Sequence, residues 1–410
     1  MFKLISSRAT NAYRAFPGLA ATALLLAACG GGGQDSGAGV ATGAGAVGTP
    51  QSFTSGRISG FGSIIVNGVR FDDSKAVIRD DDDAVKTTAE LGLGMVVEIK
   101  SDKIVKTAAR STGTAGEIVL VSELKGPVTA INASAGTLSV LGLNVTVSAN
   151  TVFDGAPNGL ASLRAGNLVE IYAALDPVSG TYAASRIELE STLAVYKLRG
   201  IVSALNTTVK TFKIGNALIS YGLVRSDELP VLSNGLLVVV RVSITEQAGM
   251  WIATKLDGGA RRVHDNDETE LEGYVSDFVS AANFKLNGIR IDASGIAVKF
   301  ENGSLASIVN GVRLEIEGDM RGGVLVAREV EFKKTERDEK LEFELHGTIL
   351  QIDAVKKTFV VRGVTVSYSD LTVFKDGTLA RLVIGARVEV KGQLTANGMS
   401  VTAVRISFES

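Results

Sequence analysis

The stretch LASLRAGNLVEIY, residues 160–172, combines the two signals that decide the fold. Leu160 and Leu163 are three residues apart, as on one face of a helical turn, and Gly166 follows at the place where such a turn ends in a left-handed residue. The residues after Gly166 alternate between apolar and polar, which predicts a β-strand. We therefore expect one short turn that is closed by glycine and leads directly into a strand.

The same combination recurs along the chain at nearly constant spacing. Each copy opens with a glycine and alternating apolar residues: GRISGF at 56, GPVTAI at 126, GIVSAL at 200, GYVSDF at 273 and GTILQI at 347. The strand after the turn recurs as GMVVEIK at 94, GNLVEIY at 166, GLLVVVR at 235, GVRLEIE at 311 and GARVEVK at 385. Two markers at constant offsets predict five repeats. Their ranges are 53–122 (repeat 1), 123–195 (repeat 2), 196–264 (repeat 3), 265–340 (repeat 4) and 341–410 (repeat 5).

Each repeat has the pattern of a small barrel. In repeat 2, GPVTAI, TLSVL and NVTVSA are predicted strands, and LVEIYA and YAASRIEL form a final hairpin after the helical turn. Three strands, a helical turn and two strands are the order of the OB-fold, a five-stranded Greek-key barrel. We expect the two leucines of the turn to plug the barrel end. The predicted fold class is all-β, with five tandem OB-like barrels.

These motifs resemble those of an uncharacterised family, a domain of unknown function that occurs in tandem in bacterial lipoproteins. The resemblance covers residues 56–410 and rests on the G-x-V/I opening, the Leu-x-x-Leu-x-x-Gly turn and the Gly-x-x-Val-Glu-Val strand. It implies a fold, and it implies no activity.

Residues 1–28 are typical of an export signal. Three basic residues, Lys3, Arg8 and Arg14, precede the apolar run 19–28, which is too short to span a bilayer as a helix. Removal of this leader leaves a mildly acidic chain, which gives no electrostatic footprint for nucleic acid or anionic lipid.

Leu26-Ala27-Ala28-Cys29 resembles the lipobox of bacterial lipoproteins. We expect cleavage before Cys29 and lipid on its thiol. The alternative is an ordinary signal peptide with a cysteine near its cleavage site. In lipoproteins, glycine after the cysteine implies transport to the outer membrane, and Gly30 stands there. The expected location is therefore the cell envelope, as an outer-membrane lipoprotein that is periplasmic or surface-exposed.

Residues 29–52 are glycine-rich and predict a flexible tether. Within them GAGAVG, residues 43–48, matches the G-x-G-x-x-G dinucleotide fingerprint. A dinucleotide site needs a strand before the match and a helix after it, whereas here glycine-rich coil precedes the match and Pro50 follows. We therefore expect no cofactor.

Two kinds of acidic segment raise the question of a metal. Asp80–Asp83 could bind Ca²⁺, but Val85 and Leu91 stand where an EF-hand loop has glycine and glutamate, which favours a solvated acidic loop. Calcium binding by this loop stays open. The charged joints 261–272 and 333–344 are expected to be solvated connectors or strand extensions. No spacing of Cys or His predicts a zinc site, so no metal is expected.

Catalysis is not expected. Four repeats carry a glutamate at one strand position: Glu98, Glu170, Glu315 and Glu389. Alternation directs these side chains away from the barrel core, so a surface role is favoured over a catalytic one. The two histidines, His264 and His346, are not accompanied by a recognisable nucleophile.

The sequence favours a structural or interaction role, with an unidentified envelope or extracellular protein or glycan as partner and no nucleic acid. The alternative is binding of an oligosaccharide or another envelope polymer on the barrel faces. Trp251 is then the candidate stacking residue, although an isolated aromatic at this position is more often part of a barrel wall.

Overall fold

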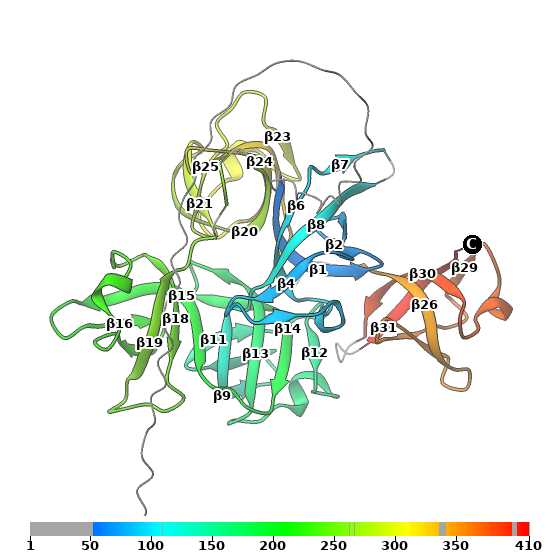
Figure 1. Cartoon of the computed structure of the whole chain (residues 1–410), viewed down its shortest axis with the longest axis horizontal. Coiled ribbons are helices and arrows are strands. Elements are labelled where there is room, and N and C mark those ends of the chain that lie inside the picture. Colours follow the sequence, from blue (N-terminus) through cyan, green and yellow to red (C-terminus); the bar gives the residue numbers. More distant parts are fainter. Residues whose placement is uncertain are drawn as a thin grey trace, which may run out of the picture. The chain divides into compact units, whose positions relative to one another are not determined.

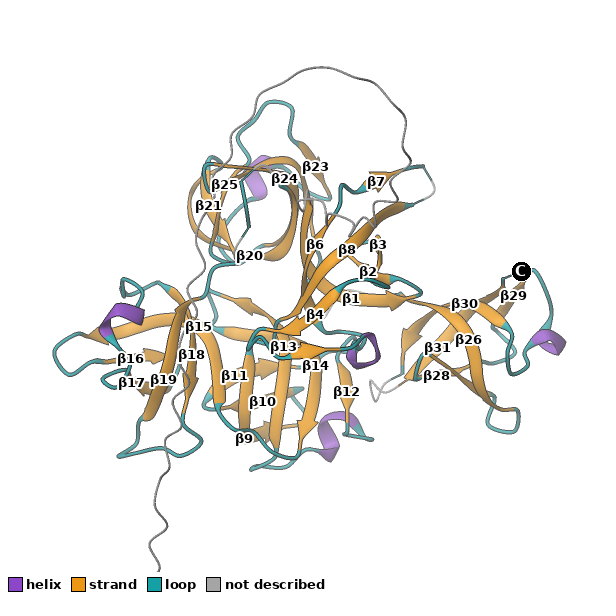
Figure 2. Ribbon diagram, in the orientation of Figure 1, coloured by secondary structure: helices purple, strands orange, loops and turns teal. Residues whose placement is uncertain are grey.

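The structure is a computed structural model, and it describes residues 52–108, 110–261, 263–265, 267–335, 342–395 and 400–409. The expected leader, the lipidation site Cys29 and all of the tether except Ser52 lie outside these residues. Within the described part the fold is all-β, with short 3₁₀ turns as its helical elements (Figure 2), which confirms the predicted fold class. In that same part of the chain, no helix has the length and apolarity needed to cross a membrane.

The elements follow a similar order in each repeat, with β5 and β7 added in repeat 1 and no short strand before η3 in repeat 3. Repeat 1 contains β1 (Ser52–Phe61), β2 (Ile64–Val66), β3 (Val69–Asp72), β4 (Val77–Asp80), β5 (Val85–Lys86), η1 (Thr88–Glu90), β6 (Val96–Ser101), β7 (Val105–Lys106) and β8 (Ser111–Leu120). Repeat 2 contains β9 (Leu124–Asn132), β10 (Thr137–Val140), β11 (Leu143–Thr146), β12 (Val152–Asp154), η2 (Gly159–Ser162), β13 (Leu168–Asp176) and β14 (Thr181–Glu190). Repeat 3 contains β15 (Tyr196–Asn206), β16 (Thr211–Ile214), β17 (Ala217–Ser220), η3 (Ser226–Glu228), β18 (Leu237–Val242) and β19 (Trp251–Gly258).

The last two repeats continue the series. Repeat 4 contains β20 (Glu268–Ser280), β21 (Asn283–Leu286), β22 (Ile289–Asp292), β23 (Lys299–Glu301), η4 (Leu305–Ser307), β24 (Arg313–Arg321) and β25 (Val324–Phe332). Repeat 5 contains β26 (Phe343–Asp353), β27 (Thr358–Val361), β28 (Val364–Ser367), β29 (Val373–Lys375), η5 (Leu379–Arg381), β30 (Arg387–Leu394) and β31 (Ser400–Phe408).

The strand pairings close small five-stranded barrels. In repeat 2, β9 is antiparallel to both β10 and β13, β10 is antiparallel to β11, β11 is parallel to β14, and β14 is antiparallel to β13. This ring has the strand order of an OB barrel. Figure 1 shows the equivalent ring of repeat 4, formed by β20, β21, β22, β25 and β24, almost end-on.

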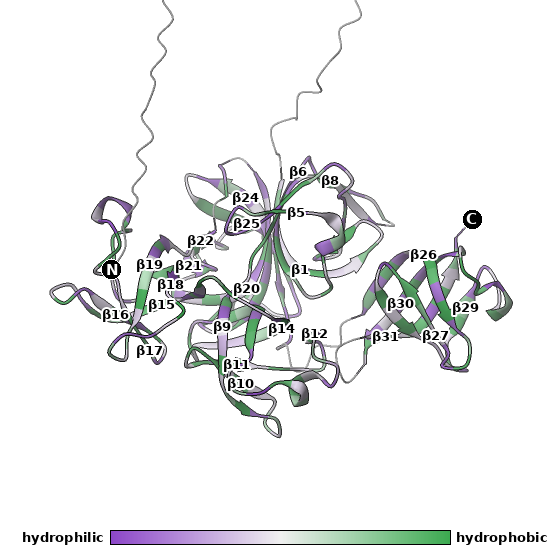
Figure 3. Ribbon diagram, turned by 60° about the horizontal axis from the view of Figure 1, so that its bottom comes forward, coloured by the Kyte–Doolittle hydropathy of each residue, from purple (hydrophilic) through white to green (hydrophobic). Residues whose placement is uncertain are grey.

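The first strand of each barrel is long because it pairs with two neighbours in turn, and the opening glycine lies at the crossing. A Cβ on Gly200 would lie 2.3 Å from Ile214 Cγ2, so only glycine fits there. Hydrophobic and hydrophilic residues alternate along the strands, as on β26 in Figure 3, so one face of each strand is buried in its barrel.

The glycine-closed turn is confirmed, and the predicted plug is only half right. Gly166 has φ +89°, as expected for a residue that closes such a turn. The second apolar residue of the turn is buried: Leu163 is 1% exposed and Leu382 is 5% exposed. The first apolar residue differs between repeats: Leu305 and Leu379 are 43% and 52% exposed, whereas Leu160 is partly buried against the core. A 3₁₀ turn is too short to direct both side chains into the barrel.

Strands also join one repeat to another. In parallel pairings, β1 pairs with β20 through Ser52–Ser55 and with β26 through Gly60 and Phe61. β9 is antiparallel to β15. These contacts lie within one compact unit of the chain, Val47–Ser410.

The joint before repeat 4 is a strand extension from Glu268 onward, whereas His264 and Asp265 at its start are exposed. β20 begins inside this joint, at Glu268, and pairs with both β1 and β24. Asp267 and Glu270 are each 7% exposed. The sequence of this joint does not show that β1 buries it, because β1 lies more than 200 residues earlier in the chain.

Candidate functional site

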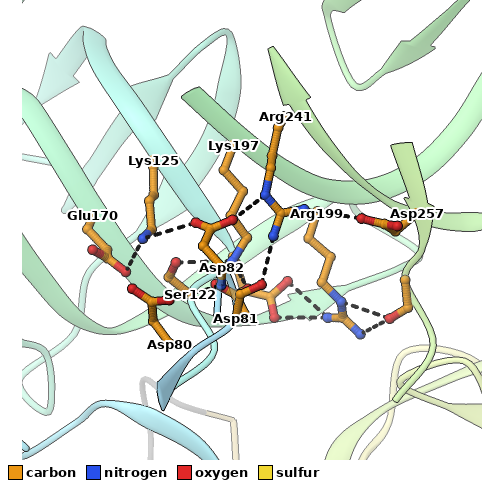
Figure 4. A network of polar contacts seen from close by, with 12 residues as sticks. Asp80, Asp81, Asp82, Ser122, Lys125, Glu170, Lys197, Arg199, Arg241 and Asp257 are labelled. Atoms are coloured by element: carbon orange, nitrogen blue, oxygen red, sulfur yellow. Dashed lines mark hydrogen bonds and ion pairs between the residues drawn. The ribbon is translucent and has the colours of Figure 1, made fainter. Parts of the chain in front are cut away.

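A network of charged side chains lies where repeats 1, 2 and 3 meet (Figure 4). The turn after β4 brings Asp81 and Asp82 of repeat 1 against three cations of the other two repeats. Asp81 pairs with Lys197, and Asp82 pairs with Arg241. Arg241 Nη2 also donates to the Asp81 carbonyl oxygen at 2.7 Å, and Lys125 Nζ lies 3.9 Å from Asp82 Oδ2. We call these residues the docking network.

The local sequence shapes the turn that enters this network. Asp80 Oδ1 accepts the backbone N–H groups of Asp82 and Ala84 at 3.0 and 2.9 Å. An aspartate that binds the backbone two residues on is a frequent turn former. The turn therefore points the next two carboxylates toward the neighbouring repeats.

The prediction of a solvated acidic loop is wrong for Asp81, whereas Asp82 and Asp83 are exposed and Asp82 still pairs with Arg241. Lys197 is fully buried, and burial raises the pKa of Asp81 even though Lys197 opposes this effect. Burial likewise lowers the pKa of Lys197. For Asp82, burial acts to raise the pKa, but the hydrogen bond and charge of Arg241 together with the charges of Lys125 and Lys197 outweigh burial and lower it. These carboxylates bind cations of the protein itself, and calcium binding by the loop stays untested.

A second, more deeply buried pair continues the network. Arg199 Nη1 donates to both carboxylate oxygens of Glu123 at 2.9 and 3.0 Å, and the two side chains are 3% and 1% exposed. Arg199 also donates twice to the Gly259 carbonyl, at 2.8 and 3.0 Å. Arg261 reaches Glu98 of repeat 1 at 2.8 Å and Glu123 at 3.4 Å. Buried charges that are paired in this way hold their neighbours in one arrangement.

The repeated glutamates point away from the barrel cores, as predicted, but they are covered by ion pairs. Their partners are Arg261 for Glu98, Lys125 for Glu170, Lys333 for Glu315, and Lys391 with Arg405 for Glu389. The side chains of these glutamates are between 14% and 24% exposed.

A cavity of 660 Å³ lies beside the docking network, and we call it the acidic cavity. One wall is apolar and includes Leu91, Leu93, Val152 and Phe153. The lining also contains carboxylates from β13 and β14. The charged residues of the lining are the acidic Asp80, Glu90, Asp154, Glu170, Glu188 and Glu190 and the basic Lys86, Arg186 and Arg362.

Three of these carboxylates lie close together. Oxygen atoms of Glu170, Glu188 and Glu190 all lie within 4.8 Å of one another, a donor set that could hold a cation. Lys125 binds Glu170 at 3.2 Å, and Arg186 binds Glu188. Among the described residues Glu190 has no ion-pair partner. Burial raises the pKa of both Glu188 and Glu190.

His346 lies in another polar cluster, between repeats 1 and 5. Its Nδ1 is 2.7 Å from Glu409 Oε1, and its Nε2 is 2.6 Å from Glu344 Oε1. Arg70 and Lys391 also bind Glu344. Burial lowers the pKa of His346, but the hydrogen bonds to the two glutamates outweigh this effect and raise it. Glu344, His346 and Glu389 also have the spacing of a metal site, but cations of the protein already bind this cluster.

A pair of carboxyl groups is buried in repeat 4. Glu270 on β20 is 7% exposed and has no cation partner among the described residues. Its neighbours are Thr54 on β1, Glu315 and Glu317 on β24, and Lys106 on β7. The other charged groups that face this pair are next to Glu315: Glu272 on β20, Glu331 on β25, and Lys333 directly after β25. Burial and the neighbouring Glu315 raise the pKa of Glu270, and burial raises that of Glu315 to about 7.

This pair predicts lower stability at higher pH. A carboxyl group whose folded pKa lies above its ordinary value contributes stability that is full below the ordinary pKa and is lost as the pH rises through the folded one. For Glu315 that window runs from the ordinary 4.5 to about 7, and the raised pKa of His346 acts in the same direction. Urea unfolding between about pH 5 and about pH 8 should show a falling free energy of unfolding. Glu270→Gln should flatten the curve, and an equal slope in this variant would contradict the assignment.

Trp251 lies in the wall of its barrel. It starts β19, is 9% exposed, and meets Tyr196 edge-on with ring centroids 5.6 Å apart. Its role in binding a polymer stays a prediction. His264 Nδ1 lies 3.9 Å from Asp267 Oδ2. Cys29 lies outside the described residues.

Sequence reasoning missed the cations of the docking network. Lys197 and Arg199 alternate with apolar residues in YKLRG, residues 196–200, which places both on the outward face of β15. Two cations on one strand face were the available signal. Nothing in the sequence shows that other repeats cover this face.

Comparisons with known proteins match three of the repeats to a family. Residues 125–188, 272–331 and 346–407 match a family described as a domain of unknown function (DUF5666), so the resemblance to an uncharacterised repeat family is confirmed. No curated protein matches the chain. Among solved structures, a chain titled "drosophila Unr CSD456" matches with 12% identity and a TM-score of 0.14, covering 54% of this chain and 98% of its own length.

Proposed function

We propose that this chain, which carries three copies of the DUF5666 domain, is a non-catalytic, lipid-anchored protein of the cell envelope. Lipid on Cys29 would hold it to the outer membrane, and residues 29–52 would act as the tether. The barrels would present a defined surface to an envelope or extracellular protein or glycan.

The observation that carries this proposal is the docking network. Its charged side chains come from repeats 1, 2 and 3 and bind one another, so they fix the repeats in one arrangement. Glu123 and Arg199 are almost fully buried, and a buried pair of this kind favours one packing over others because a shifted packing would leave a charge unpaired. Such a fixed arrangement favours binding of a partner, because a surface that is already ordered loses less conformational entropy when the complex forms.

Replacement of the lipidation site tests the anchor. Cys29→Ser removes the thiol that would carry the lipid, so the protein should lose label from a fatty-acid precursor and move from the membrane to the soluble fraction. Two or more acyl chains are needed for stable anchoring, so the shift should be nearly complete. Ser36→Ala, in the tether, is the matched control and should stay in the membrane fraction. Unchanged membrane retention of Cys29→Ser would contradict the anchor.

Crosslinking in the native envelope tests the interaction role. The expected result is one defined partner, and its capture should weaken when Arg199→Met loosens the repeats. Efficient turnover of a small substrate by the purified chain would overturn the non-catalytic proposal.

A further inference from the structure

The acidic cavity has the size and lining of a site for a small organic ligand. Its 660 Å³ fall within the range of ligand pockets, and its lining combines apolar with charged side chains. Acidic residues outnumber basic ones in the lining, so a cationic ligand would be favoured.

Repeat 4 shows what kind of cation this position accepts. Glu315 and Glu331 face each other across β24 and β25, as Glu170 and Glu188 do across β13 and β14. In repeat 4 the ammonium group of Lys333 lies between the two carboxylates, 2.9 Å from each.

The residue that corresponds to Lys333 in repeat 2 is acidic. Lys333 comes two residues after Glu331, directly after the last strand of its repeat, and Glu190 comes two residues after Glu188, at the end of the last strand of repeat 2. Repeat 2 therefore keeps the facing glutamates and replaces the ammonium by a third carboxylate. Lys125 binds Glu170 from β9, and Arg186 binds Glu188, but neither bridges the two glutamates and neither pairs with Glu190.

Like charges that face each other across two strands are destabilising. An external ammonium group would relieve this repulsion in repeat 2, as Lys333 does in repeat 4. The alkyl chain of such a ligand would lie along the apolar wall formed by Leu91, Val152 and Phe153.

We propose that the acidic cavity binds a small aliphatic amine, whose ammonium group is held by Glu170, Glu188 and Glu190 in the place that Lys333 fills in repeat 4. This site goes beyond the proposed envelope role and does not depend on the lipid anchor. Its ligand class is the alkyl diamines and polyamines.

Titration calorimetry of the whole mature chain tests the site, with 1,4-diaminobutane and spermidine as probes at constant ionic strength. We expect saturable binding of one molecule per chain. Glu190→Lys copies the repeat 4 arrangement, so its own ammonium group should fill the site and weaken diamine binding at least about tenfold, without lowering the melting temperature. Glu246→Lys makes the same charge change at an exposed residue of repeat 3 and should bind as the wild type does.

Other outcomes would overturn the proposal. Absence of saturable binding would do so, and an equal loss in Glu190→Lys and Glu246→Lys would show general charge attraction instead of a site. Ca²⁺ or Mn²⁺ binding that excludes the diamine would assign the carboxylates to a metal. If Glu190→Lys does not fold, Glu190→Gln replaces it in the test. Glu190→Gln should fold and bind the diamine more weakly than the wild type. Unchanged binding would refute the site.

Discussion

Replacing Arg199 by methionine is expected to lower the free energy of unfolding by about 3–5 kcal/mol. Arg199 is 2% exposed and makes four hydrogen bonds, two to Glu123 and two to the Gly259 carbonyl. Methionine keeps much of the side-chain volume but leaves the Glu123 carboxylate buried without its main partner. The cost is that of an uncompensated buried charge.

Urea unfolding of Arg199→Met, followed by circular dichroism, measures this cost. Arg225→Met is the matched control: Arg225 pairs with Asp227, but its side chain is 71% exposed, so solvent screens the pair and the loss of stability should be much smaller than in Arg199→Met. The double variant Glu123→Leu/Arg199→Met removes both charges and should be more stable than Arg199→Met alone. Equal stability of Arg199→Met and Arg225→Met would refute the role of the buried pair.

The barrels themselves could be predicted from the sequence because their signals are local. The turn that ends at Gly166 and the alternation that follows it involve residues within a few positions of each other, and repetition removes accidental matches. The short strands β12, β23 and β29 were missed because each has only three residues, too few to show alternation.

The docking network and the acidic cavity could not be predicted, because both depend on which repeats touch. Asp81 and Lys197 are 116 residues apart in the chain, and the sequence around each residue does not predict their contact. Alternation correctly placed Glu170 outside its barrel, but the rule that outward residues are solvated fails where another repeat covers that face. Aligning the repeats shows only that Glu190 in repeat 2 stands where repeat 4 has Lys333. The structure is needed to show that Lys333 lies between two carboxylates.

The junction of repeats 1 and 2 should also be sensitive to one glycine. Gly94 and Gly166 are equivalent: both close the turn, with φ of +80° and +89°, and both donate to the first strand of their repeat at 2.8 Å. They differ in their surroundings. A Cβ on Gly94 would lie 2.4 Å from the Ser185 carbonyl oxygen of repeat 2, whereas a Cβ on Gly166 meets nothing within 4 Å. Ser185 Oγ also donates to the Gly94 carbonyl at 2.6 Å, so the backbone there has little freedom to move.

We therefore expect Gly94→Ala to cost about 2–5 kcal/mol of unfolding free energy, since it adds a clash with backbone to the strain of a left-handed alanine. Gly166→Ala carries the strain alone and should cost about 1–2 kcal/mol. Chemical unfolding of the two variants, made in the same full chain, gives the difference directly, and that difference measures how tightly repeat 1 is seated on repeat 2. Limited proteolysis adds a second measurement: Gly94→Ala should open cleavage near the junction and Gly166→Ala should not. If the two variants lost the same stability, the contact with Ser185 would not hold the repeats together in solution, and the fixed arrangement on which the proposed surface depends would be refuted.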